Sequence, residues 1–90
     1  MWAIYELRNV VKRISQLPRH ILKKYELWKS IVRYNGPEML KGFKGFHDES
    51  LKGEWRGYRS SRLDILYRVI YRVSRDEMAV YVDDISPHQY

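Results

Sequence analysis

The 90-residue sequence contains no cysteine. This absence excludes a disulfide framework, a thiol nucleophile and thiolate ligands for a metal. No run of about 18 apolar residues occurs, so we expect no helix that spans a membrane. The opening residues, MWAIYELRNV, lack the charged and long apolar regions of a signal peptide. We therefore expect one cytoplasmic domain that covers residues 1–90.

Histidine is scarce, and the three that occur are far apart. His20, His47 and His88 show neither an HxxxH nor an HExxH spacing, so we expect no zinc site. The glycine-bearing stretch KGFKGF at 41–46 lacks the GxxxxGK[ST] pattern of a phosphate-binding loop. The sequence thus gives no sign of a zinc enzyme or of a P-loop nucleotidase.

Basic and apolar residues are what the sequence does have. Its 44% hydrophobic and 14% aromatic content is enough for a folded core. The net charge is +6, and lysine and arginine outnumber acidic residues most clearly in residues 1–45. Such a charge suggests a polyanionic partner such as nucleic acid. A plain solvated surface is the alternative, because ordinary domains can be this basic.

The periodicity of apolar residues predicts an α+β domain. Ile21, Tyr25, Trp28 and Val32 recur at helical spacing within residues 19–34. This apolar helix face needs a cover, and a sheet is the obvious one. The predicted order is a strand at 2–6, a short helix after Asn9, a helix at 19–34, and an antiparallel meander at 54–63, 65–73 and 78–85.

The strand ILYRVIYRV at 65–73 poses a particular question. One of its faces is apolar, whereas the other places Arg68 between Leu66 and Ile70. Neighbouring strands lie about 5 Å apart, so Arg68 and the upstream Arg56, Arg59 and Arg62 can converge on one patch. Guanidinium groups bind phosphate through paired hydrogen bonds. In the alternative, their stems shield the sheet and their charges pair with Glu54, Asp64 or Asp83.

Several short motifs together resemble the RelE/ParE superfamily of bacterial toxins. The stretch LKGEWRGYR at 51–59 looks like the L-x-G-x-W-x-G-Y-R pattern of YafQ-type members. The strand YRVIY at 67–71 is widespread in the superfamily, and LPRHI at 17–21 resembles the usual entry to its second helix. The closing PHQY also fits. The likeness covers nearly the whole chain.

The resemblance implies the toxin of a type II toxin–antitoxin system. Such a toxin is an endoribonuclease that cleaves mRNA in the ribosomal A site, and its partners are mRNA, the ribosome and a cognate antitoxin. The 2′-hydroxyl attacks the adjacent phosphate, and neither a metal nor another cofactor is needed. A ParE-type toxin that inhibits gyrase and a non-catalytic RNA-binding homologue remain alternatives, because fold does not fix function.

The resemblance also assigns site residues. Arg68 matches a phosphate-contacting arginine, and Arg62 lies where YafQ-type members carry a catalytic histidine. His88 matches their C-terminal histidine, which acts in proton transfer, and Tyr90 matches the closing aromatic residue. Further RNA contacts are expected from the basic residues Lys52, Arg56, Arg59, Lys23 and Lys24.

The sequence departs from the YafQ-type pattern at a further catalytic position. A histidine expected near Glu49 is absent, and His47 is two positions away. Arginine stays protonated at neutral pH, so Arg62 and Arg68 suit charge stabilisation rather than proton transfer. His88 is therefore predicted to carry the proton-transfer role.

Overall fold

The computed structural model describes residues 1–87, so the predictions for His88 and Tyr90 lie outside the described residues. Within residues 1–87, no helix is both long and apolar enough to cross a bilayer. The elements, in chain order, are β1 (Ala3–Glu6), α1 (Arg8–Ile14), α2 (Arg19–Asn35), the 3₁₀ turns η1 (Pro37–Gly42) and η2 (Lys44–Phe46), β2 (Glu49–Ser50), η3 (Gly53–Trp55), β3 (Arg59–Arg62), β4 (Tyr67–Ser74) and β5 (Ala79–Pro87).

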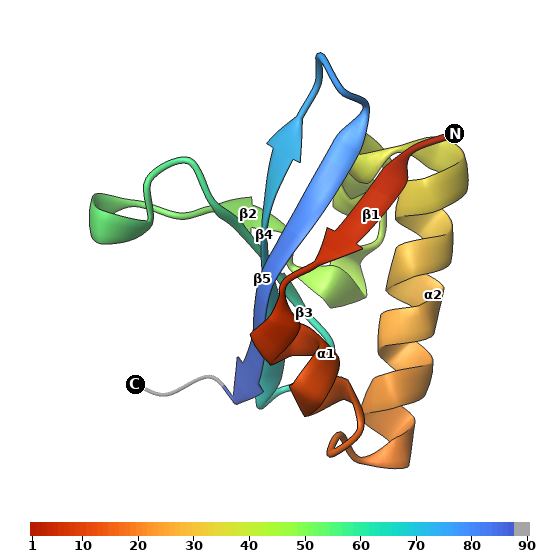
Figure 1. Cartoon of the computed structure of the whole chain (residues 1–90). Coiled ribbons are helices and arrows are strands. Elements are labelled where there is room, and N and C mark those ends of the chain that lie inside the picture. Colours follow the sequence, from red (N-terminus) through yellow and green to blue (C-terminus); the bar gives the residue numbers. More distant parts are fainter. Residues whose placement is uncertain (88–90) are drawn as a thin grey trace.

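The strands form one five-stranded sheet in the order β1-β5-β4-β3-β2, with α2 along one side (Figure 1). The predicted α+β fold and its strand–helix–helix–meander order are confirmed. Two details differ. The sheet is mixed, because β1 pairs with β5 in parallel. A two-residue β2 also adds to its other edge, where only a connection was predicted.

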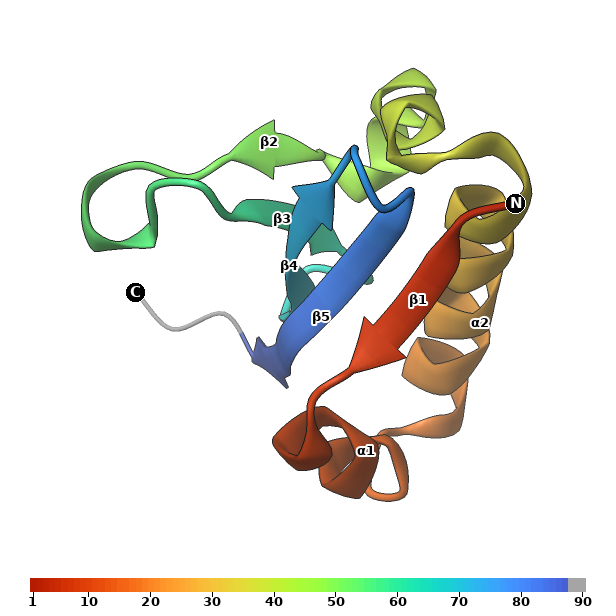
Figure 2. The same cartoon turned by 45° about the horizontal axis from the view of Figure 1, so that its top comes forward.

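The first strand of the meander is shorter than predicted. It begins at Arg59, because η3 turns the chain just before it. Gly53 and Gly57 supply the turn, with φ angles of +67° and +96° that side chains with a Cβ rarely adopt. Figure 2 shows this green segment between β2 and β3 extending beyond the sheet, away from α2. It carries Trp55 out to the edge of the sheet.

The core lies between α2 and the sheet. Ile21, Tyr25, Trp28 and Val32 are all fully buried, as the helical periodicity predicted. Burying such a side chain contributes about 1.5–3 kcal/mol. The Trp28 ring also lies edge-on to Tyr71 of β4, with centroids 5.2 Å apart. The aromatic face of α2 thus covers one face of the sheet.

Alternation along β4 separates its two faces. Val69 and Tyr71 join the core under α2. Arg68 and Ile70 lie on the opposite face, where both line a hollow. A β-bulge follows, because Ile70 pairs with Asp84 whereas Tyr71 pairs with Val82. The predicted division of this strand into an apolar face and an arginine-bearing face is confirmed.

Candidate functional site

A buried carboxylate fixes the segment that enters β2. The side chain of Asp48 is 0% exposed and accepts a 2.6 Å hydrogen bond from Arg59 Nη2. It also accepts 2.5 Å bonds from the hydroxyls of Ser61 and Tyr71. Trp28 Nε1 of α2 donates to Ser61 Oγ at 2.9 Å and so joins the same network. We call Asp48, Arg59, Ser61 and Tyr71 the anchor cluster, because it ties β2, β3 and β4 to one another.

The protonation states in the anchor cluster follow from its contacts. Burial, reinforced by the bond to Asp48, raises the pKa of Tyr71, so its hydroxyl remains a donor. Burial alone would lower the pKa of Arg59, but the Asp48 carboxylate outweighs burial and raises it. Arg59 Nη1 also donates to Ser50 Oγ at 2.7 Å. The Arg59 guanidinium is therefore charged and already bonded.

Arg59 does not join the other arginines on one patch, contrary to the expectation from spacing. Arg59 pairs with Tyr71 across β3 and β4, whereas Arg62 pairs with Arg68. Residues three apart on a strand point to opposite faces. Arg59 therefore lies on the helix-covered face, and Arg62 and Arg68 lie on the open one.

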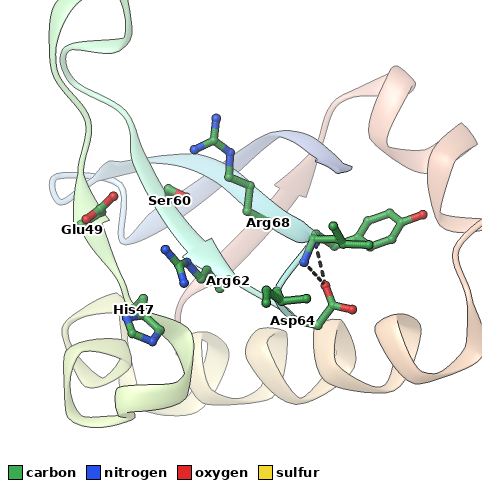
Figure 3. A pocket seen from close by; sticks show the side chains of 9 residues that line it. His47, Glu49, Ser60, Arg62, Asp64 and Arg68 are labelled. Atoms are coloured by element: carbon green, nitrogen blue, oxygen red, sulfur yellow. Dashed lines mark hydrogen bonds between the residues drawn. The ribbon is translucent and has the colours of Figure 1, made fainter. Parts of the chain in front are cut away.

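Arg62 and Arg68 stand directly opposite each other and line one small hollow. In Figure 3, Arg62 lies between His47 and Arg68, and Glu49 approaches from the neighbouring segment. Within residues 1–87, neither guanidinium forms an ion pair with a carboxylate. We call Arg62 and Arg68 the arginine pair. Two facing guanidinium groups that are not paired with a carboxylate suit a phosphate.

Two of the acidic residues proposed as alternative partners are bonded elsewhere, Asp83 to Arg72 at 3.3 Å and Asp64 to the turn that follows it. Asp64 accepts from the backbone N–H groups of Leu66 and Tyr67 at 2.8 and 2.7 Å. Its other oxygen lies 3.4 Å from His20 Nε2. Burial opposes ionisation of Asp64, but these bonds outweigh it and lower its pKa. Asp64 thus stabilises the turn between β3 and β4 rather than neutralising the arginine pair.

Two groups capable of proton transfer lie beside the arginine pair. His47 and Glu49 both line its hollow, and they flank Asp48 in the chain. His47 has a left-handed backbone, with φ of +43°, directly after the buried Phe46. Sequence reasoning gave neither residue a primary role. The available signal was the resemblance, which places a histidine near Glu49, two positions from His47.

The basic residues predicted to bind RNA are distributed over different surfaces. Lys24 of α2 lines a shallow hollow with His47 and Arg62, and its Nζ lies 5.0 Å from the centre of the Phe46 ring. Lys23 is exposed on the same helix. Lys52 and Arg56 are exposed on the segment between β2 and β3. Of the lysines predicted to bind RNA, Lys24 thus shares a hollow with Arg62 of the arginine pair.

The structure brings together Arg62 and Arg68 of the four predicted catalytic residues. The other two, His88 and Tyr90, lie beyond residue 87 and keep the status of predictions. In the part of the chain that is described, no group of three or more potential metal ligands occurs.

Comparison with solved structures places this mixed sheet and helical hairpin in a known class of small α+β domains. It is the fold of the RelE/ParE superfamily, and the resemblance noted in the sequence is confirmed at the level of the fold. A chain of the YoeB–YefM complex from Staphylococcus aureus is 26% identical, with a TM-score of 0.71. That match covers 100% of this chain and 99% of the other.

Two further structures extend the likeness. A chain of the archaeal RelE–RelB complex from Pyrococcus horikoshii is 24% identical, with a TM-score of 0.75, and the match covers 96% of this chain and 93% of that one. YafQ from E. coli is 13% identical, with a TM-score of 0.78, over 98% and 94% of the two chains. No protein-family model matches the sequence, and no curated protein does.

Proposed function

We propose that this chain is the toxin of a type II toxin–antitoxin module and a metal-independent endoribonuclease that cleaves mRNA in the ribosomal A site. The observation that carries the proposal is the arginine pair, which faces an open hollow lined by His47 and Glu49. Like charges placed directly opposite each other on a sheet are destabilising. Two facing arginines that pair with no carboxylate within residues 1–87 therefore favour an anionic ligand.

The chemistry follows from the groups around the hollow. The 2′-oxygen of RNA forms a bond to the adjacent phosphorus, and the bond from phosphorus to the 5′-oxygen breaks. Charge that develops on the phosphorane is stabilised by Arg62 and Arg68. The proton of the 2′-hydroxyl passes to Glu49 or His47 as general base, and a protonated histidine can donate a proton to the leaving 5′-oxygen, which becomes the 5′-hydroxyl. The predicted His88 would be the second histidine for these two proton transfers.

The proposed partner is a cognate antitoxin, in the cytoplasm. The structures similar to this chain include chains from complexes described as RelE–RelB and YoeB–YefM. An antitoxin that masks the arginine pair would prevent phosphate binding. A small protein encoded beside this chain is the candidate to test for binding and neutralisation.

Primer extension on translated mRNA tests the proposal. The wild-type protein should produce ribosome-dependent cuts whose downstream fragments carry a 5′-hydroxyl, which polynucleotide kinase labels without prior phosphatase treatment. Loss of a proton-transfer group lowers the rate about 10²–10⁴-fold, so His47→Ala should cut much more slowly. Arg75→Gln is the control, because Arg75 pairs with the exposed Glu38 in a different part of the chain.

Other outcomes would redirect the assignment. Gyrase-dependent DNA breaks without RNA cuts would indicate a ParE-type toxin. RNA binding without cuts in any translated message would indicate a non-catalytic homologue. Wild-type rates in His47→Ala would remove His47 from the mechanism and leave the proton transfers to Glu49, His88 or Tyr90.

A further inference from the structure

A second hollow lies on the open face of the sheet, beside the arginine pair. It has a volume of about 370 Å³, near the lower end of the range typical of small-ligand sites. Its walls come from four parts of the chain: Arg13 on α1, Trp55 on η3, Arg68 and Ile70 on β4, and Asp84, Ser86 and Pro87 on β5. Figure 1 shows η3, β4 and β5 around the side of the sheet away from α2.

The walls of this hollow combine apolar surface with one available charge. Trp55, Ile70 and Pro87 provide apolar surface. The acid on its rim, Asp84, has one oxygen 3.5 Å from Arg13 Nε, close enough for an ion pair, but this buried oxygen accepts no hydrogen bond within residues 1–87. Arg68 forms no ion pair within the described residues 1–87. An aromatic plane beside a free guanidinium suits a flat, polar ring joined to a phosphate.

Trp55 is held in place although it is exposed. Trp55 is 49% exposed. Its ring packs edge-on against the ring of Tyr58, with the ring centroids 5.4 Å apart and an angle of 85° between the ring planes. Backbone bonds close the segment around it, from Leu51 N to Tyr58 O at 2.9 Å and from Tyr58 N to Trp55 O at 2.9 Å. An exposed indole on a hydrogen-bonded turn loses little freedom when a ligand stacks on it.

Arg68 lines both hollows. A phosphate bound by the arginine pair would therefore lie at the boundary between them. Single-stranded RNA presents bases next to phosphates, and exposed aromatic residues bind unpaired bases by stacking. The second hollow stands where the base next to the bound phosphate can reach it.

We infer that Trp55, Arg68 and Ile70 form a subsite for one unstacked nucleobase adjoining the scissile phosphate. This inference rests on the proposed ribonuclease function. It adds a binding site for a base, which would contribute to the enzyme's preference among nucleotides. Trp55 supplies the stacking plane, Ile70 the apolar floor, and Arg68 the contact that links base and phosphate.

Binding of short 2′-O-methyl RNA oligonucleotides tests the subsite without cleavage, because the attacking hydroxyl is capped. Trp55→Ala should weaken binding about 5- to 150-fold, the range for losing one base stack. Trp55→Phe should retain most of the affinity but lose the fluorescence quenching that RNA causes in the wild type. Tyr34→Ala removes a still more exposed aromatic residue, on α2, and should leave the affinity unchanged.

An abasic scan makes the test specific to a base. A series of oligonucleotides is used in which each member lacks the base at one position. One member of the series should bind the wild type weakly, with the affinity that Trp55→Ala has for the intact RNA. The wild type and Trp55→Ala should bind that oligonucleotide with the same affinity. Equal binding by wild type and Trp55→Ala to every intact oligonucleotide would overturn the subsite while leaving the ribonuclease proposal standing. Failure of the wild type to bind or cut any RNA would overturn both.

Discussion

Arg59 and Arg62 are three residues apart on the same strand and have opposite fates. Arg59 points to the helix-covered face and is bonded to the buried Asp48. Arg62 points to the open face, directly opposite Arg68, and is exposed. Arg59 stabilises the fold through its ion pair, whereas the guanidinium of Arg62 remains accessible to a ligand. The difference follows from the two-residue period of a strand.

The comparison shows why charge alone does not locate a site. The anchor cluster satisfies its charge inside the protein, so it contributes to stability and offers nothing to a ligand. The arginine pair places two like charges side by side, at a cost of about 0.2–1 kcal/mol. A protein that breaks a stabilising rule usually does so at a functional position. We propose that the open face of β3 and β4 is such a position.

The largest expected effect comes from removing the carboxylate of the anchor cluster. Asp48→Ala leaves Arg59 partly buried without its partner, and breaking a buried ion pair costs about 3–5 kcal/mol. The free energy of unfolding, measured in urea, should fall by that amount. Glu49→Ala, one residue away and exposed, should change it by less than about 0.5 kcal/mol. Equal effects of the two substitutions would show that the anchor cluster does not stabilise the fold.

The hydroxyl of Tyr71 should make stability depend on alkaline pH. Because its pKa is raised in the folded state, its contribution is fully present below the ordinary value of about 10. Above that pH the unfolded chain releases the proton first, so stability should fall by about 1.4 kcal/mol per pH unit for this group. Urea unfolding at several alkaline pH values measures the slope. Tyr71→Phe should reduce the slope, whereas the exposed Tyr34→Phe should leave it unchanged.

A smaller effect separates two lysines of α2. Lys24 lines the hollow beside His47 and Arg62, whereas Lys29 pairs with Glu6 and Glu26. Lys24→Gln should weaken RNA binding and reduce the slope of log affinity against log salt by about 0.7. Lys29→Gln should leave that slope as in the wild type. A reduced slope in Lys29→Gln alone would place the RNA on a different side of α2.

Much of the fold could be predicted because its signals are local. The spacing of Ile21, Tyr25 and Trp28 defined the buried face of α2, and the alternation around Arg68 defined the faces of β4. The parallel pairing of β1 with β5 has no such signal, since it depends on long-range contacts. The two-residue β2 is too short to show any periodicity.

The site was only partly predictable for the same reason. The arginine pair could be inferred from residue type and resemblance. Asp48 could not, because it is a single acid in an irregular connection, and its partners Arg59, Ser61 and Tyr71 are 11, 13 and 23 residues away. The odd spacing from Arg59 to Arg62 did contain the information that they point to opposite faces.

The measurement that tests this account most directly compares Arg59→Gln with Arg62→Gln in the same two assays. Both proteins are assayed for unfolding free energy and, under conditions where both are folded, for mRNA cleavage. Arg62→Gln should change the unfolding free energy by less than about 0.5 kcal/mol and lower cleavage about 10²–10³-fold. Arg59→Gln should lose about 3 kcal/mol of stability and, while folded, cut at close to the wild-type rate. The reverse pattern, or cleavage that survives intact in Arg62→Gln, would contradict the division of labour between the two faces.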